Sequence, residues 1–231
     1  MSKKRGYEAK PRNTNLRKRK SIVLLAAEGK NKTETLYFKS IPSATHVIRF
    51  APGNYTDPVN MVHTLRKEFD DLGLDLQLGD IAYCLVDSDV DPRKDKQLEK
   101  ADAVAGEEVK VIVSNPCFEI WYLCHFLAST KQYASSNEVL KAVQQYIPEY
   151  SKSMKGLWDR IGGRTETAIS NAIILEDKCL EQSLKPHTTA FMPSTEVYRI
   201  LKLLFPKEKH TPALMESIVA ENEETFKELA K

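Results

Sequence analysis

Four short apolar segments, separated by stretches suited to helices, constrain this chain more than any other feature of its sequence. The segments span residues 21–27, 46–50, 81–86 and 109–113. The first of them, residues 21–27, is a continuous apolar run, which is typical of a strand that is buried on both faces. The intervening stretches have helical content or periodicity and span residues 33–41, 58–73 and 92–105. This alternation predicts an α/β fold with a mainly parallel sheet covered by helices on both faces.

After the fourth apolar segment the pattern becomes helical. Ser114-Asn115-Pro116 offers a cap and a proline at the first position of a helix over residues 117–127. Further helices are predicted over residues 136–146, 165–184, 195–205 and 212–229, with breaks at Gly162-Gly163 and Pro193. We therefore expect a basic arm over residues 1–20, an α/β core over residues 21–130, and a helical C-terminal part over residues 131–231 that packs on the core.

Charge is distributed unevenly along the chain. The first 20 residues hold nine Lys and Arg residues against Glu8, a net charge of +8; the whole chain carries +2, so the remainder carries −6. A segment this basic, with polar spacers and no apolar periodicity, is expected to be disordered in the free protein and to neutralise nucleic-acid phosphates. A solubilising leader without specific contacts is the alternative.

Several classes of protein are disfavoured by composition and motif. No apolar run reaches the ~20 residues needed to span a bilayer, and no signal-peptide pattern is found, so we expect a cytoplasmic protein without a membrane anchor. The absence of a Gly-x-x-x-x-Gly-Lys-Ser/Thr motif argues against ATP hydrolysis by this chain. Cys84, Cys117, Cys124 and Cys179 lack Cys-x-x-Cys spacing and are expected to be reduced and buried. A zinc site from Cys117, Cys124 and His125 is the weaker alternative.

Acidic residues follow three of the four predicted strands. Glu28 comes after the first, Asp87 and Asp89 come after the third, and Glu119 lies in the first turn of the helix after the fourth. Because loops at the carboxyl ends of parallel strands converge, we expect these side chains to share one crevice. An Asp-x-Asp pair supplies the oxygen ligands that Mg²⁺ or Mn²⁺ prefers. The helix macrodipole also favours acids at helix N-termini, so each acid has a structural alternative.

Basic residues near these acids are candidates for contacting phosphate. Lys30 and Lys32 lie in the polar turn after the first strand, whereas Lys152 and Arg164 belong to a later basic stretch that includes Trp158. This stretch is expected to guide a nucleic-acid strand toward the acids. Ordinary solvation of a surface loop or face is the alternative for all four residues.

The chain resembles the RloB-like family in several short segments. These are Ala27-Glu28-Gly29, Thr33-Glu34, Tyr37-Phe38, Asp87-Ser88-Asp89, Ser114-Asn115-Pro116-Cys117-Phe118-Glu119-Ile120-Trp121 with His125-Phe126, and the weaker Tyr150-x-Lys152 and Pro193-Ser194-Thr195. The resemblance covers roughly residues 20–205. The family is bacterial, is often encoded beside an ATPase in phage-exclusion operons, and is similar to Toprim domains, the metal-binding fold of topoisomerases, primases and certain nucleases.

The resemblance implies a Toprim-like core in which Glu28 is the general acid or base and also a metal ligand. Asp87 and Asp89 would hold Mg²⁺ or Mn²⁺, with Glu119 as a further catalytic carboxylate. The expected function is a metal-dependent nuclease that cleaves RNA, with tRNA as one candidate, or DNA, and that acts in phage defence with a partner ATPase. One alternative is a non-catalytic nucleic-acid-binding or regulatory subunit, and another is a nucleotidyl transferase or primase-like enzyme. Assembly into a homo-oligomer is left open.

Overall fold

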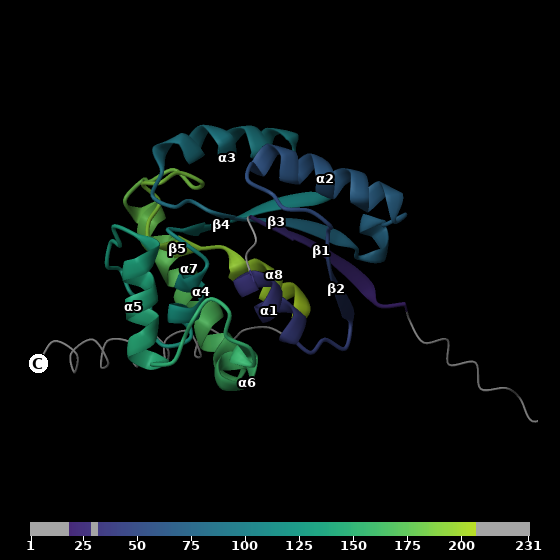
Figure 1. Ribbon diagram of the computed structural model, residues 1–231. Coiled ribbons are helices and arrows are strands. Elements are labelled where there is room, and N and C mark those ends of the chain that lie inside the picture. The colour runs from purple at the N-terminus through teal and green to yellow at the C-terminus, as the bar shows by residue number, and fades with distance from the viewer. Residues whose placement is uncertain (1–18, 29–31, 207–231) are drawn as a thin grey trace, which may run out of the picture.

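A five-stranded sheet forms the centre of the computed structural model, which describes residues 19–28 and 32–206 (Figure 1). The strands are β1 (Ser21–Ala27), β2 (His46–Phe50), β3 (Ile81–Asp87), β4 (Val109–Asn115) and β5 (Ser194–Thr195). Their order across the sheet is β2-β1-β3-β4-β5, and all neighbouring strands are parallel except β4 and β5. The predicted α/β fold with a mainly parallel sheet is confirmed.

Helices cover both faces of this sheet. Helices α2 (Pro58–Asp71) and α3 (Pro92–Val104) lie together on one face (Figure 1). The other face carries α1 (Lys32–Ser40), α4 (Glu119–Cys124), α7 (Thr165–Glu181) and α8 (Val197–Leu204), with α5 (Ser136–Tyr146) and α6 (Leu157–Ile161) packed beside them. Two short 3₁₀ helices, η1 (Leu76–Leu78) and η2 (Gly162–Arg164), precede β3 and α7.

The strands contribute side chains to two hydrophobic cores, one on each face of the sheet. In β1, Leu24 and Ala26 belong to the core shared with α2 and α3, whereas Val23 and Leu25 belong to the core shared with the other helices. All four side chains are buried. Burial on both faces explains why this strand is an unbroken apolar run rather than an alternating one.

The predicted helix over residues 117–127 is shorter than expected. Strand β4 continues through Ser114 and Asn115, the Asn115-Pro116 peptide bond is cis, and α4 begins at Glu119 without a side-chain cap. Ser114-Asn115-Pro116 is therefore not a helix cap. The side-chain nitrogen of Asn115 instead donates to three backbone carbonyl groups at 3.0 to 3.2 Å. All three belong to the loop over residues 182–193, which we call the α7–β5 loop.

Strand β5 and helix α6 were not predicted from the sequence. The predicted helix over residues 195–205 begins at Val197, because Ser194 and Thr195 pair with β4 in an antiparallel arrangement. The hydroxyl groups of Thr195 and Ser114 also share a hydrogen bond of 2.9 Å. A strand of two residues carries no periodicity, so the hydrophobic pattern does not indicate it.

All four cysteines are buried free thiols, as expected. In the described part of the chain, no helix has the length and apolar character needed to cross a membrane. Most of the predicted basic arm, residues 1–18, lies outside the described residues, as does the predicted helix over residues 212–229.

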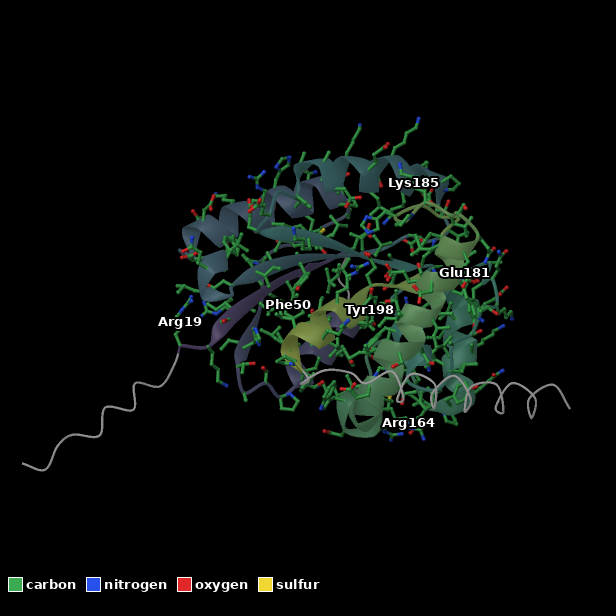
Figure 2. The ribbon with its side chains drawn as sticks, turned by 180° about the vertical axis from the view of Figure 1, so that it is seen from behind. Arg19, Phe50, Arg164, Glu181, Lys185 and Tyr198 are labelled. Atoms are coloured by element: carbon green, nitrogen blue, oxygen red, sulfur yellow. The ribbon has the colours of Figure 1, made fainter. Side chains whose placement is uncertain are left out.

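A charged histidine holds the α7–β5 loop against α3. His187 Nδ1 lies 2.7 Å from Asp102 Oδ2, and its Nε2 lies 2.8 Å from Glu196 Oε2. Both nitrogens must carry a proton for both hydrogen bonds to form. Burial alone would lower the pKa of His187, but the two carboxylates outweigh burial and raise this pKa to about 10. Lys185, which Figure 2 shows on the same loop, adds an ion pair to Glu99 at 3.2 Å.

We predict that this clamp makes stability depend on pH. Because the pKa of His187 is higher in the folded chain than in the unfolded one, its stabilisation is complete below pH ~6.5 and is lost as pH rises through about 10. In urea unfolding at pH 6, His187→Gln should lower the free energy of unfolding by roughly 1.5–3 kcal/mol. The exposed His63→Gln serves as the control. A deficit of His187→Gln that is equally large above pH 10 would contradict the charged clamp.

Candidate active site

The carboxyl ends of β1 and β3 lie side by side where the winding of the sheet reverses. From β1 the chain passes to β2 on one side, whereas β3 and β4 lie on the other. Open parallel sheets bind ligands at such a switch point, because the loops that leave the two strands diverge and form a crevice. Glu28 directly follows β1 and Asp87 ends β3, so these two predicted acids flank the switch point.

The loop over residues 88–91 follows an unusual backbone path at this edge. Asp89 and Val90 have positive φ angles of 53° and 56°, a conformation that is costly for a β-branched residue. Hydrogen bonds to the end of β4 hold the loop in place. The backbone N–H groups of Ser88 and Asp89 donate to carbonyl groups there at 3.0 Å, and the Ser88 hydroxyl donates to Asn115 Oδ1 at 2.7 Å.

Three carboxylates from different elements influence one another at this edge. They are Asp87 at the end of β3, Glu34 in α1 and Glu119 in α4. Glu34 and Glu119 are almost completely buried, with 3% and 1% of each residue exposed. Burial, together with the negative charges of Glu34, Glu119 and Asp89, raises the pKa of Asp87 well above its usual range. The cluster is therefore short of positive charge.

Glu119 receives partial compensation from Tyr150 and Lys152. The hydroxyl of Tyr150 donates to Glu119 Oε1 at 3.2 Å, and Lys152 Nζ lies 3.7 Å from the same oxygen. Burial opposes the charge of Lys152, but the nearby carboxylates, Glu119 foremost, raise its pKa. The side chain of Lys152 is 53% exposed, so its ammonium group faces both the cluster and solvent. The structure thus brings this predicted lysine to the predicted acids.

Glu28 pairs with a buried lysine of α3. Lys94 Nζ lies 2.5 Å from both carboxylate oxygens of Glu28 and 3.2 Å from the carbonyl oxygen of Asp87. It also lies 3.6 Å from Asp89 Oδ2. Burial raises the pKa of Glu28, and the Lys94 ammonium offsets only part of this shift.

Of the other predicted phosphate-binding residues, Arg164 does not join this group. Arg164 lies at the end of η2, where its guanidinium carbon is 5.3 Å from the centre of the Phe126 ring. Figure 2 shows it beside the short helices that precede α7. Lys30 lies outside the described residues, and so does the side chain of Lys32, although its backbone begins α1.

Carboxylate oxygens are the ligands that Mg²⁺ and Mn²⁺ prefer, so the donors at this edge fit a divalent cation by their chemistry. Among residues 19–28 and 32–206, however, no three His, Cys, Asp or Glu side chains are grouped so that they could hold a metal ion as they stand. Lys94 engages Glu28, and Tyr150 and Lys152 engage Glu119. Side-chain rotation at Asp87 and its neighbours would be needed to close a cation site.

Glu34 and Lys94 belong to this site but were not predicted for it. Glu34 occurs in a segment that resembles the RloB-like family. It lies in the first turn of α1, the helix that follows β1, and this position is the signal that could have identified it. Lys94 lies in a highly charged helix. It is distinguished only by its spacing from Leu98 and Ala101, which places it on the buried face of α3.

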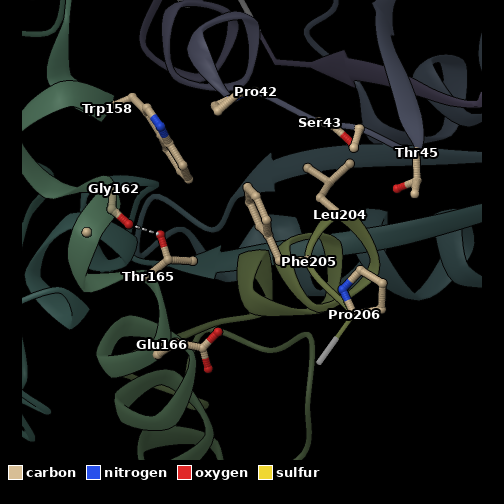
Figure 3. A pocket seen from close by; sticks show the side chains of 12 residues that line it. Pro42, Ser43, Thr45, Trp158, Gly162, Thr165, Glu166, Leu204, Phe205 and Pro206 are labelled. Carbon is tan, nitrogen blue, oxygen red and sulfur yellow. Dashed lines mark hydrogen bonds between the residues drawn. The ribbon is translucent and has the colours of Figure 1, made fainter. Parts of the chain in front are cut away.

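A separate open groove lies between α6 and the end of α8 (Figure 3). Its volume is about 900 Å³, and Trp158, Leu204 and Phe205 give it a largely apolar lining. The rings of Trp158 and Phe205 stack with their centres 5.7 Å apart. Of the described acids, Glu166 lines the groove and none of the site carboxylates does. We therefore treat the groove as distinct from the candidate active site.

The fold and the site together define an α/β protein with a carboxylate-rich crevice at the switch point of a parallel sheet. A model of the RloB-like protein family matches residues 23–204. The chain belongs to this family, so the resemblance noted in the sequence is confirmed. The matched region contains all five site carboxylates together with Lys94 and Lys152. No curated protein and no solved structure matches the chain.

We predict that Asp87→Asn stabilises the chain when divalent cations are removed. Asn keeps the shape of Asp but removes a charge that burial and neighbouring carboxylates oppose. At pH 8 in a chelating buffer, the free energy of unfolding should rise by about 1–2 kcal/mol, which is within the usual range for a single substitution. Denaturant unfolding measures the change, and the exposed Asp70→Asn should alter it by less than about 0.5 kcal/mol. If Asp87→Asn is less stable than the wild type, the neighbouring carboxylates do not destabilise the charge of Asp87 as we describe.

Proposed function

We propose that this chain is a Toprim-type nuclease that hydrolyses phosphodiester bonds in RNA or DNA with the help of Mg²⁺ or Mn²⁺. The observation that carries the proposal is the gathering of carboxylates and lysines at the carboxyl ends of parallel strands. They are Glu28, Glu34, Asp87, Asp89, Glu119, Lys94 and Lys152. Membership of the RloB-like family supports the proposal.

The cation would be held by Asp87 and Glu119, with Glu34 and Asp89 beside them. Burial and the repulsion from these neighbouring carboxylates together raise the pKa of Asp87 in the absence of a cation, which supports this assignment. When bound, the cation supplies positive charge to the phosphate and lowers the pKa of a bound water.

The remaining groups supply a route for protons and a contact for the substrate. Glu28 has a raised pKa, because burial outweighs its ion pair with Lys94, and such a carboxyl is suited to accept or donate a proton. Lys152 holds Glu119 at 3.7 Å while half of its side chain remains exposed. Its ammonium group is therefore placed to meet a substrate phosphate.

Nucleic acid is the proposed substrate, and an operon-encoded ATPase is the proposed partner. The net charge of +8 in residues 1–20 supports the first, and membership of the RloB-like family supports the second, together with a role as an effector of phage defence. One observation favours the alternative of a non-catalytic subunit. Lys94 contacts both oxygens of Glu28 at 2.5 Å, so in this structure the proposed acid or base is engaged.

We predict that Glu28→Gln lowers the cleavage rate by at least ~10²-fold, because Gln keeps the size of Glu but cannot exchange a proton. The measurement uses purified protein with Mg²⁺ or Mn²⁺, with and without the partner ATPase, on tRNA, single-stranded DNA and plasmid. Glu107→Gln, at an exposed position before β4, is the matched control and should cut at the wild-type rate.

Two results would change the assignment. If Glu28→Gln cuts as fast as the wild type, Glu28 is a structural residue at the end of β1. If the wild type binds nucleic acid but never cuts it under any of these conditions, the chain is a binding or regulatory subunit.

A further inference from the structure

The ammonium group of Lys94 lies where a cation bound by oxygen atoms would be expected. Its neighbours are both carboxylate oxygens of Glu28, the carbonyl oxygen of Asp87 and a carboxylate oxygen of Asp89. We infer that Lys94 is a built-in cation that takes the place of a second divalent ion beside Glu28, so that the site binds one divalent cation, at Asp87. This inference rests on the proposed function and deepens it.

The contacts of Lys94 leave little capacity for another cation at Glu28. An ammonium group has three N–H donors, and the groups within reach of Lys94 are two carboxylates and one carbonyl, at 2.5, 3.6 and 3.2 Å. A divalent ion with oxygen ligands at about 2.1 Å would need the same oxygens of Glu28. It would therefore have to displace Lys94.

Helix α3 holds Lys94 in this position. The buried residues of this helix are Lys94, Leu98 and Ala101. Their spacing places them on one face of the helix, toward the sheet. Asp91 caps the helix by accepting from the Arg93 backbone N–H at 3.0 Å. Withdrawal of Lys94 would leave Glu28 as an uncompensated charge at a site that is 17% exposed, which is costly.

Lys152 provides the contrast on the other side of the crevice. Its Nζ lies 3.7 Å from Glu119, and its side chain is 53% exposed, against 10% for Lys94. An exposed lysine at this distance is weakly held and can move into solvent when a divalent cation arrives. The ammonium group of Lys94 thus occupies the site beside Glu28. Lys152, in contrast, can leave the site beside Asp87 and Glu119 to a divalent cation.

Lys94 also contacts the residues that are predicted to bind the metal. Sites with two metal ions hold their ions about 3.5–4 Å apart. Lys94 contacts the carbonyl oxygen of Asp87 and the carboxylate of Asp89, the two aspartates of the predicted metal-binding pair. The ammonium group is therefore next to the residues that we propose as ligands of the ion.

The test counts Mn²⁺ ions bound by the full chain and by Lys94→Met, which keeps an unbranched side chain one atom shorter than that of Lys and removes its charge. Calorimetric titration gives the stoichiometry, and electron paramagnetic resonance at saturating Mn²⁺ distinguishes isolated ions from a spin-coupled pair. The expected result is one equivalent and an isolated ion for the wild type. Lys94→Met should bind one additional equivalent, with a spin-coupled spectrum. Lys96→Met, at an exposed position on α3, should behave as the wild type.

The outcomes separate this inference from the proposed function. If the wild type and Lys94→Met both bind one equivalent, the inference about Lys94 is wrong and the metal-dependent nuclease stands. If the wild type binds none and Lys94→Met binds one, Lys94 stands as the built-in cation beside Glu28 but the proposed cation site at Asp87 fails; if neither binds Mn²⁺, both fail. Should Lys94→Met not fold, the wild type decides, because a spin-coupled pair in it overturns the inference and a single isolated ion supports it.

Discussion

The burial of β1, β3 and β4 on both faces is the constraint on which the rest of this structure depends. Side chains inside these strands must be apolar, because helices cover the sheet on both sides. Polar chemistry is therefore confined to the strand ends and the turns that follow them. Since the three strands are parallel, their carboxyl ends share one edge, and Glu28, Asp87 and Glu119 are brought together although 91 residues separate the first from the last.

Negatively charged side chains gather at that edge, and two lysines offset their charge to different degrees. Lys94 contacts both oxygens of Glu28 from a rigid position on α3, whereas Lys152 approaches Glu119 from an exposed segment. Asp87 lies between these two pairs and keeps a raised pKa. The raised pKa of Asp87 is the observation that supports our proposal of cation-assisted chemistry over a purely structural ion-pair network.

Much of this arrangement could be predicted from the sequence, and the misses have physical causes. The predicted bounds of β1 and β2 are confirmed. The bounds of β1 agree with its apolar run, because a strand buried on both faces needs apolar side chains throughout its length. The helix cap assigned to Ser114-Asn115-Pro116 was wrong because the side chain of Asn115 bonds to a loop more than 70 residues later. Lys94 was overlooked because its role depends on Glu28 lying across from α3, a tertiary contact that a charged helix does not reveal.

Asn115 connects the loop over residues 88–91 of the candidate site to the rest of the molecule. The side-chain oxygen of Asn115 accepts from the hydroxyl of Ser88, next to Asp87. Its side-chain nitrogen donates to the α7–β5 loop. The same α7–β5 loop is held against α3 by His187, and α3 carries Lys94. The two sides of the crevice are thus tied to one loop, through the end of β4 on one side and through α3 on the other. A change that releases the α7–β5 loop would therefore reach the candidate site by two routes, through the end of β4 and through α3.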